Sequence, residues 1–199
     1  PVESLSYFQG LKYRIAGLGG EVMTRMGCVT LMTPPGEIAA ALLSGAVDAA
    51  DWIGPWNDRA FGLYRSAKNC YMPGMHEPGP GLEVIMNRDL FESLTDSQKT
   101  AVRVAARATA AETLSDFTFH NITSLQPLLA EEGVVLRSFS DEIVAEMAKH
   151  AADAVEDLGG SDALTGKVHR SFMAFLEQAR GYSPYAEGGL LAWRAAHAS

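Results

Sequence analysis

A single segment, residues 44–56, constrains the fold most narrowly, because it passes from a helix end through a strand to a Gly-Pro pair. Apolar residues recur at helical spacing over residues 35–43, and Gly45 suits the left-handed position that ends many helices. The following stretch, Ala46–Ala50, is short and apolar enough for a buried strand. The order of these signals predicts an α/β arrangement.

Asp51 and Trp52 come directly after this predicted strand. In open α/β sheets, small ligands bind in the crevice beyond the carboxyl ends of the strands. Aspartate offers hard oxygen ligands, and an indole offers a flat apolar surface with one N–H donor. The segment therefore predicts a ligand site at the strand end, with Trp52 in the site and Trp56 in the core.

Arg14 lies near the end of a second predicted strand, Leu11–Ala16, in which apolar and polar residues alternate. A glycine-rich turn and a helix over Glu21–Met26 are expected to follow it. The guanidinium group matches a carboxylate with two parallel hydrogen bonds, so Arg14 is a candidate anion ligand. A structural ion pair with Asp48 or Asp51, or simple exposure at the surface, is the alternative.

The later chain is expected to add strands and long helices. Thr95 and Gln98 form a capping box that begins a long helix, which reaches at least Ser115 and continues to Glu131 with a bend near Pro127. The other expected elements are strands over Leu82–Asn87 and Val134–Phe139 and helices over residues 140–158, 165–180 and 187–197. Together they indicate an α/β class with a partly parallel sheet and long carboxyl-terminal helices.

Composition excludes several classes of protein. The chain has 199 residues, 47% of them hydrophobic, and no apolar run near the roughly 18 residues of a membrane span. A net charge of −8 without a basic cluster argues against nucleic acid. Two cysteines, Cys28 and Cys70, lack zinc-site spacing, which favours free thiols and leaves a disulfide open.

No catalytic motif is present. The residue types of a hydrolase triad are present as Ser44, Asp48 and His76. However, the chain lacks the Gly-x-Ser-x-Gly elbow of serine hydrolases and the H-E-x-x-H helix of metalloproteases. The glycines of residues 17–20 lack the pattern of a phosphate-binding loop, and space for packing explains them better. A binding protein is therefore favoured over an enzyme.

Three blocks of the sequence resemble a known family. They are Phe8-Gln-Gly-Leu-Lys-Tyr-Arg14, the stretch from Gly36 to Asp48, and Asp51-Trp-Ile-Gly-Pro-Trp-Asn57 with Pro73-Gly-Met-His-Glu-Pro78. In this order they resemble the solute-binding subunits (DctP type) of tripartite ATP-independent periplasmic (TRAP) transporters, most closely the branch that binds 2-oxoacids. The resemblance runs from Phe8 to about Arg180.

The resemblance implies a periplasmic-binding-protein-like, two-lobed fold that is truncated at the N-terminus, because the first block lies well inside the family's chains. It implies that residues 1–77 and 118–160 form ligand-binding lobe II and that residues 78–117 are a returning part of lobe I. Residues 161–199 are expected to be helices that pack across the lobes or between subunits. The hinges fall near residues 77 and 117. No secretion signal is legible in this chain, and a periplasmic location is expected.

The resemblance also implies roles for individual residues. Arg14 is expected to grip the ligand carboxylate, with Trp52 and Asn57 beside it. A bridging sodium or calcium ion is expected at the Asp51 carboxylate, the Trp52 carbonyl and Glu77, although the family often has Glu where this chain has Asp51. The alternatives are two solvated carboxylates and an Asn57 that caps a helix. No cofactor is required.

The expected partners are a small carboxylate, such as the 2-oxoacid pyruvate, and the TRAP membrane permease. An exposed sheet edge and apolar helix faces predict a homo-oligomer. The resemblance implies that the segment after Pro184 can be exchanged between its subunits. The alternative is a truncated remnant that oligomerises and no longer binds ligand. A small hydrolase is the less favoured alternative.

Overall fold

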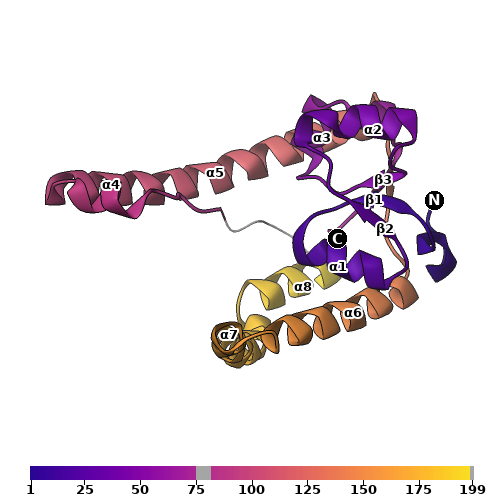
Figure 1. The fold of residues 1–199 in the computed structure, drawn as a ribbon. Coiled ribbons are helices and arrows are strands. Elements are labelled where there is room, and N and C mark those ends of the chain that lie inside the picture. The colour runs from indigo at the N-terminus through magenta and orange to yellow at the C-terminus, as the bar shows by residue number, and fades with distance from the viewer. Residues whose placement is uncertain (75–81, 198–199) are drawn as a thin grey trace. The chain divides into compact units, whose positions relative to one another are not determined.

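The computed structural model describes residues 1–74 and 82–197 (Figure 1). Contacts within the chain group it into two units, Pro1–Met147 and Ala148–Ser199. The division falls inside helix α6 (Asp141–Gly159). Each unit is described by itself below.

The first unit is built on two small parallel sheets. In one, β1 (Lys12–Arg14) lies between β2 (Val29–Leu31) and β3 (Ala49–Ala50). In the other, β4 (Asn69–Tyr71) pairs with β5 (Val135–Arg137), which is far away in sequence. Parallel pairing is typical of α/β folds, in agreement with the predicted class.

The central strand β1 is the point at which the chain changes direction across the sheet. Helix α1 (Gly17–Arg25) leads from β1 to β2 on one side, whereas the turn η2 (Pro35–Glu37) and helix α2 (Ile38–Ser44) lead to β3 on the other. Open α/β sheets bind ligands at such a switch point, outside the carboxyl ends of the strands. In β1 that end is Arg14.

The predicted passage from helix to strand is confirmed. Helix α2 ends at Ser44, and Gly45 takes the left-handed conformation with φ of 73°. Strand β3 follows, and after it helix α3 (Pro55–Ala60) begins with a proline in its first turn, where the missing N–H costs nothing. A short turn, η3 (Leu63–Arg65), comes next.

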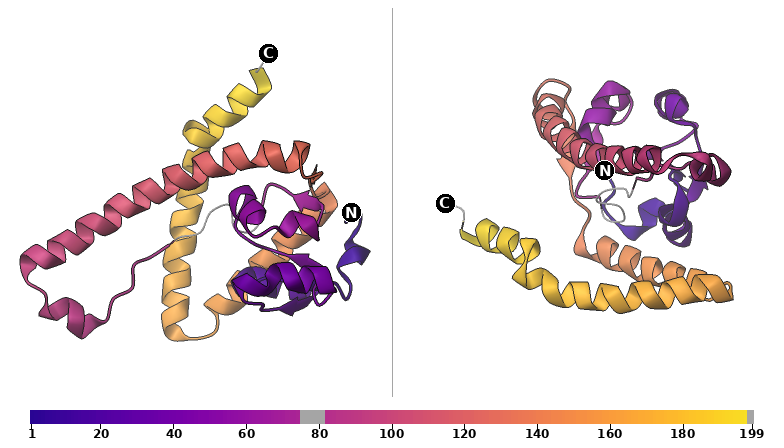
Figure 2. Two further views of the ribbon diagram at one scale, coloured as in Figure 1. Left: turned by 90° about the horizontal axis from the view of Figure 1, so that it is seen from above. Right: turned by 90° about the vertical axis from the view of Figure 1, so that its left-hand side faces the viewer.

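The long helix α5 (Asp96–Ala130) begins at the predicted capping box of Thr95 and Gln98 and contains Pro127. Figures 1 and 2 show it as one continuous helix. The short helix α4 (Arg88–Ser93) precedes it, with the side chain of Asn87 capping the Leu90 amide at 3.0 Å. Helix α3 packs on the later part of α5 through Trp56, whose ring lies 5.1 Å from that of Phe117.

The core of the first unit is formed by apolar side chains from many elements. Burying each large side chain contributes roughly 1.5–3 kcal/mol. Those with the least exposure come from the turn η1 (Leu5–Phe8), from α1, from α2 and the loop after it, and from α5 and the start of α6: Phe8, Val22, Met23, Ile38, Val47, Leu128, Ile143 and Met147.

The second unit consists of the end of α6, helix α7 (Ala163–Tyr182), the turn η4 (Ser183–Tyr185) and helix α8 (Glu187–His197). A Cβ atom at Gly159 would lie 2.6 Å from the ring of His169, so the glycine lets α6 and α7 approach closely. Asp162 caps α7 and accepts hydrogen bonds from the amides of Leu164 and Thr165.

Two local predictions are wrong. Residues 82–87 have no regular secondary structure, and Leu82, Val84 and Ile85 are exposed, because no strand of the described residues lies beside them to complete a sheet. The expected glycine-rich turn is instead the first turn of α1, which begins at Gly17. A Cβ atom at Gly20 would lie 3.4 Å from the carbonyl oxygen of Ile15, which supports packing space as the reason for that glycine.

None of the described helices is both long enough and apolar enough to cross a bilayer.

Cys28 and Cys70 are free thiols, which confirms the favoured interpretation over a disulfide. Burial raises the pKa of the Cys28 thiol to about 11, and burial followed by the charge of Asp58 raises the pKa of Cys70.

Since the thiolate is the reactive form, both thiols should react slowly in the folded protein. A chromogenic disulfide reagent at pH 8 should report slow reaction in buffer and two thiols in denaturant. Fewer than two thiols in unreduced protein would contradict this.

The cap of α7 predicts a pH dependence. Hydrogen bonds from the side chain and amide of Thr165, then from the amide of Leu164, lower the pKa of Asp162. Its stabilisation is therefore present above the unfolded pKa and is lost as the pH falls through the lower folded value. Asp162→Asn keeps an oxygen acceptor that does not titrate. Its stability relative to the natural protein, measured by urea unfolding, should improve as the pH falls from about 5 to about 2. A difference in stability between the two proteins that does not change with pH would contradict this role of the Asp162 carboxylate.

Candidate functional site

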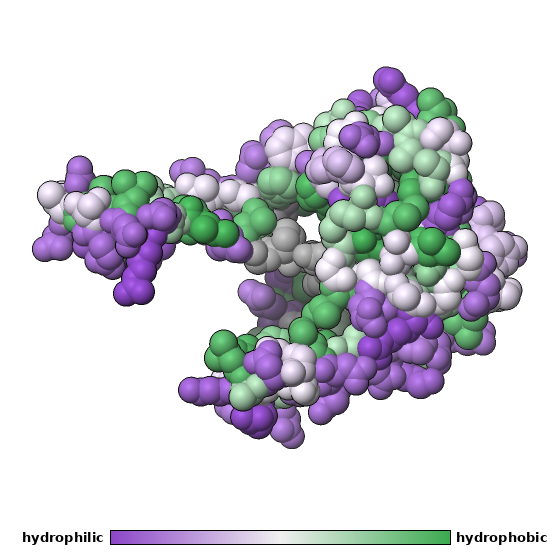
Figure 3. Space-filling model, in the orientation of Figure 1, coloured by the Kyte–Doolittle hydropathy of each residue, from purple (hydrophilic) through white to green (hydrophobic). Residues whose placement is uncertain are grey.

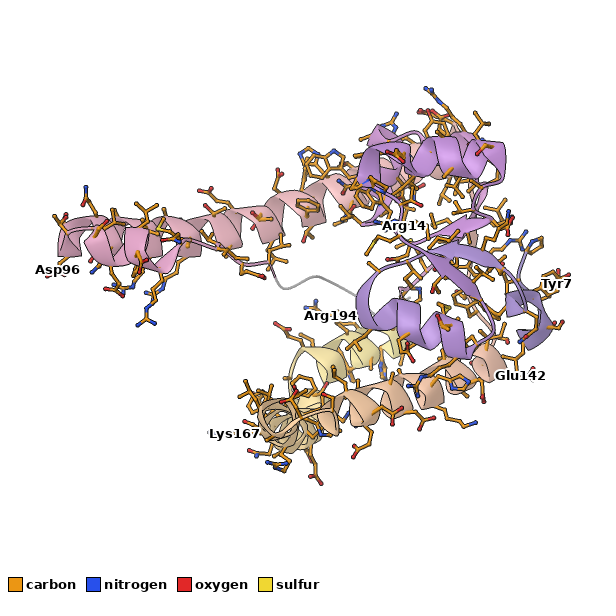
Figure 4. All side chains as sticks on the ribbon, in the orientation of Figure 1. Tyr7, Arg14, Asp96, Glu142, Lys167 and Arg194 are labelled. Atoms are coloured by element: carbon orange, nitrogen blue, oxygen red, sulfur yellow. The ribbon has the colours of Figure 1, made fainter. Side chains whose placement is uncertain are left out.

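Arg14 ties together the carboxyl ends of all three strands of the first sheet (Figure 4). Its Nε donates to the carbonyl oxygen of Thr33, which follows β2, at 3.2 Å. Its Nη1 donates to the carbonyl oxygen of Asp51, which follows β3, at 2.7 Å. The two neutral acceptors hold the guanidinium in one orientation at the switch point.

The Arg14 side chain is buried, with 7% of the residue exposed. The two hydrogen bonds use two of the five N–H donors of the guanidinium, and no acceptor among the described residues takes the other three. Main-chain carbonyl groups carry no net charge, and a buried charge is costly unless an opposite charge meets it. The arrangement suits an anion that approaches the remaining N–H groups.

The alternative of an ion pair between Arg14 and Asp48 is wrong. Asp48 Oδ2 accepts a hydrogen bond from the Lys12 amide at 3.0 Å, and Oδ1 lies 3.7 Å from Lys12 Nζ. Asp48 therefore belongs to the start of β1 and not to the end at which Arg14 lies. Surface exposure of Arg14 is excluded by its burial.

Trp52 lies beside Arg14. The guanidinium carbon is 5.3 Å from the centre of the Trp52 ring, a cation–π distance, and the ring of Phe61 meets Trp52 edge-on at 5.4 Å. The indole Nε1 is buried and has no hydrogen-bond partner among the described residues. A buried donor without a partner costs free energy that a ligand oxygen would recover. The structure thus places Trp52 beside Arg14, and its role in ligand binding stays a prediction.

Asn57 lies inside helix α3, where its carbonyl oxygen accepts from the Phe61 amide, so the alternative that it caps a helix is wrong. Its side-chain Oδ1 is buried and lacks a partner among the described residues. Trp56, in contrast, packs against α5, as expected for a core residue. The loop and first turn after β3 thus hold two buried polar atoms that need partners.

Two carboxylates share this region. Burial, followed by the charge of Asp51, raises the pKa of the Asp58 carboxyl to about 6. Burial and then the same Asp51 charge raise the pKa of Tyr13. Sequence reasoning missed Asp58, although its place directly after Asn57 in the first turn of α3 was a usable signal.

The oxygen donors after β3 fit the chemistry of a sodium or calcium ion, which prefers carboxylate, carbonyl and amide oxygens. The relevant groups are the mutually repelling carboxylates of Asp51 and Asp58 and the unpartnered Oδ1 of Asn57. Residues 1–74 and 82–197 contain no group of three or more His, Cys, Asp or Glu side chains placed to hold a metal. Glu77, the third predicted ligand, lies outside the described residues, as do His76 and the first predicted hinge.

A parallel sheet with a buried arginine at its switch point is an arrangement that suits α/β binding proteins. Residues 1–160 match the family model described as bacterial extracellular solute-binding protein, family 7 (DctP). The chain belongs to this family.

Individual relatives agree with the family. The chain is 37% identical over 177 residues to the monocarboxylate 2-oxoacid-binding periplasmic protein all3028 of Nostoc sp., covering 89% of this chain and 48% of that protein. It therefore spans about half the length of this curated relative.

Solved structures give the same fold. A TRAP periplasmic solute-binding protein from Colwellia psychrerythraea, with bound calcium and pyruvate, matches with a TM-score of 0.91 and 27% identity. The match covers 96% of this chain and 58% of that one. A TRAP solute-binding protein from Bordetella bronchiseptica, a mixed-occupancy dimer with calcium and picolinate, matches with a TM-score of 0.94 and 28% identity over 98% and 58% of the two chains.

These comparisons confirm the predicted family and the fold class of the periplasmic binding proteins. They agree with the prediction of a binding protein over an enzyme, because the matching family and its solved members are solute-binding proteins. The predicted division into lobes and the roles of individual site residues stay predictions.

Proposed function

We propose that this protein is the solute-binding component of a TRAP transporter and that it captures a small organic acid, a 2-oxoacid such as pyruvate, through Arg14. The observation that carries the proposal is the buried guanidinium, which two main-chain carbonyl groups orient while three N–H donors find no acceptor among the described residues. A similar protein from Colwellia psychrerythraea has bound pyruvate.

The chemistry of a 2-oxoacid suits the groups around Arg14. Its carboxylate accepts two parallel hydrogen bonds from a guanidinium, which are stronger than neutral ones. The buried Nε1 of Trp52 can donate to a further ligand oxygen, and the indole face covers the apolar part of a small acid. Arg14 would thus provide affinity, whereas Trp52 and Asn57 would set the orientation of the ligand.

A sodium or calcium ion is part of the proposal. It would be held by the Asp51 carboxylate, the Trp52 main-chain carbonyl and Glu77, and it would offer positive charge to the ligand oxygens. Such an ion would also offset the charge of Asp51, which after burial is the second cause of the raised pKa of Asp58. Related proteins contain calcium or sodium together with pyruvate. No other cofactor is proposed.

The remaining steps follow from the receptor role. Lobe II (residues 1–77 and 118–160) and the returning part of lobe I (residues 78–117) would close around the ligand through hinges near residues 77 and 117. The closed receptor would then deliver its ligand to the TRAP membrane permease from the periplasm, the compartment named for its relatives. The alternative is a remnant that oligomerises without binding ligand.

A homo-oligomer is proposed on the basis of exposed apolar surface. One face of α7 exposes large apolar side chains at helical spacing: Leu164, Val168, Phe172 and Phe175. Trp193 and Leu191 of α8 are also exposed, and Figure 3 shows further apolar surface along α4 and α5. Contiguous apolar faces of this kind mark contact surfaces. A second copy is the proposed occupant, because a similar protein forms a dimer, and the segment after Pro184 would be exchanged.

The role of Arg14 can be tested by titration calorimetry with pyruvate, longer 2-oxoacids and lactate, in the presence of calcium or sodium. Arg14→Met should weaken binding by about tenfold to a hundredfold, since hydrogen bonds to a charged group contribute about 1.5–3 kcal/mol. Arg14→Lys keeps the positive charge but lacks the planar guanidinium, so its affinity should lie between those of the natural protein and Arg14→Met. Melting temperatures measured in parallel separate affinity from folding.

Arg59→Ala is the matched control, because Arg59 is an exposed arginine of α3 that pairs with Glu131 at 3.7 Å. Its affinity should equal that of the natural protein. Absence of binding to every acid, with either cation, would contradict the proposed function and favour the non-binding alternative. Equal affinity in Arg14→Met would instead show that Arg14 is not the ligand-binding residue.

The oligomer can be tested by light scattering. The expected mass is a multiple of the 21.3 kDa chain mass. Phe172→Glu should shift the protein toward the monomer, because a buried unpaired charge opposes association. Leu43→Glu, at an exposed apolar position of α2 outside these faces, is the control and should leave the mass unchanged. A stable monomer of the natural chain would contradict the proposal.

A further inference from the structure

Helix α3 begins without a capping side chain of its own. Gly54, at the N-cap position, has none, and Pro55, the first helical residue, has no N–H. The first amide that needs an acceptor is therefore that of Trp56. Asn121, in the long helix α5, supplies it: its Oδ1 accepts a hydrogen bond from the Trp56 amide at 3.1 Å.

The backbone at Gly54 makes room for this cap. A Cβ atom placed at position 54 would lie 2.9 Å from Asn121 Oδ1 and 3.3 Å from Nδ2. Any side chain there would have to displace the amide of Asn121. A distant asparagine thus occupies the space in which most helices place their own capping residue.

The same turn of α5 holds the side chain of Trp56. The Trp56 ring stacks on His120 with the ring centres 4.4 Å apart, and it meets Phe117 edge-on at 5.1 Å. Phe117, His120 and Asn121 are spaced by three and one residues, so they lie on one face of the helix. One face of α5 therefore holds both the main chain and the side chain of Trp56.

The segment held in this way is the one that carries the candidate site. The chain runs from Asp51, whose carbonyl oxygen accepts from Arg14, through Trp52 to Gly54. It continues into α3, where Asn57 has its unpartnered Oδ1. At its start, the segment is held by Arg14 and β1, and at its end by Asn121.

We infer that Asn121 is a positioning residue, which holds the segment from Asp51 to Asn57 in its ligand-binding conformation without touching the ligand. The inference rests on the proposed function and adds a residue of α5 to that site. Loss of a capping oxygen increases local opening of a helix end. A site whose groups must be reordered on binding has a lower affinity.

The test combines Asn121→Ala with Asn121→Asp in the whole chain. The alanine variant should show about fivefold faster hydrogen exchange at the amides of Trp56–Asp58 without ligand, and about fivefold weaker binding of pyruvate with calcium. The aspartate variant keeps the capping oxygen and should restore both values to within about twofold. A second rescue is Gly54→Ser in the Asn121→Ala background, which provides a cap from the N-cap position itself.

Asn87→Ala is the matched control, because Asn87 caps α4 through the Leu90 amide with the same chemistry. It should destabilise the protein to a similar degree and leave pyruvate affinity unchanged. Faster exchange in Asn121→Ala with unchanged affinity would overturn the positioning role, as would an equal loss of affinity in Asn87→Ala. If the natural protein binds no acid, the proposed function fails, whereas the exchange comparison still decides whether Asn121 holds the segment.

Discussion

The rest of the structure around the site depends on a buried guanidinium at the end of a central strand. Arg14 joins the carboxyl ends of both flanking strands through main-chain carbonyl groups, at Thr33 and Asp51. The scaffold therefore depends on the residue that is proposed to bind the ligand. Because carbonyl dipoles orient the charge without neutralising it, the fold holds a buried positive charge that suits the proposed anion.

The features that were predicted well from the sequence depend only on residues that are close together along the chain. A left-handed Gly45, a small apolar strand and a Gly-Pro pair are local signals, and they placed Asp51 and Trp52 at a strand end correctly. The capping box at Thr95 is equally local. The alternation of apolar and polar residues over Leu11–Ala16 placed Arg14 near the end of a strand. This prediction did not require the positions of the neighbouring strands.

The features that sequence missed need a partner from elsewhere in the chain. Strands β2 and β4 were not predicted, and they form because β1 and β5 pair with them. Residues 82–87 show the converse, because their strand-like composition has no partner among the described residues. The cap of α3 joins Trp56 and Asn121, which are 65 residues apart, so no local pattern contains it.

Charged groups of both signs lie at this strand end. Arg14 offers N–H groups that no acceptor among the described residues takes, whereas burial and then the charge of Asp51 raise the pKa of the Asp58 carboxyl to about 6. An anion alone would satisfy the arginine and face the carboxylates, and a cation alone would do the reverse. In the proposed function, a carboxylate ligand paired with a cation would offset both terms, so the site would bind the two together more readily than either alone.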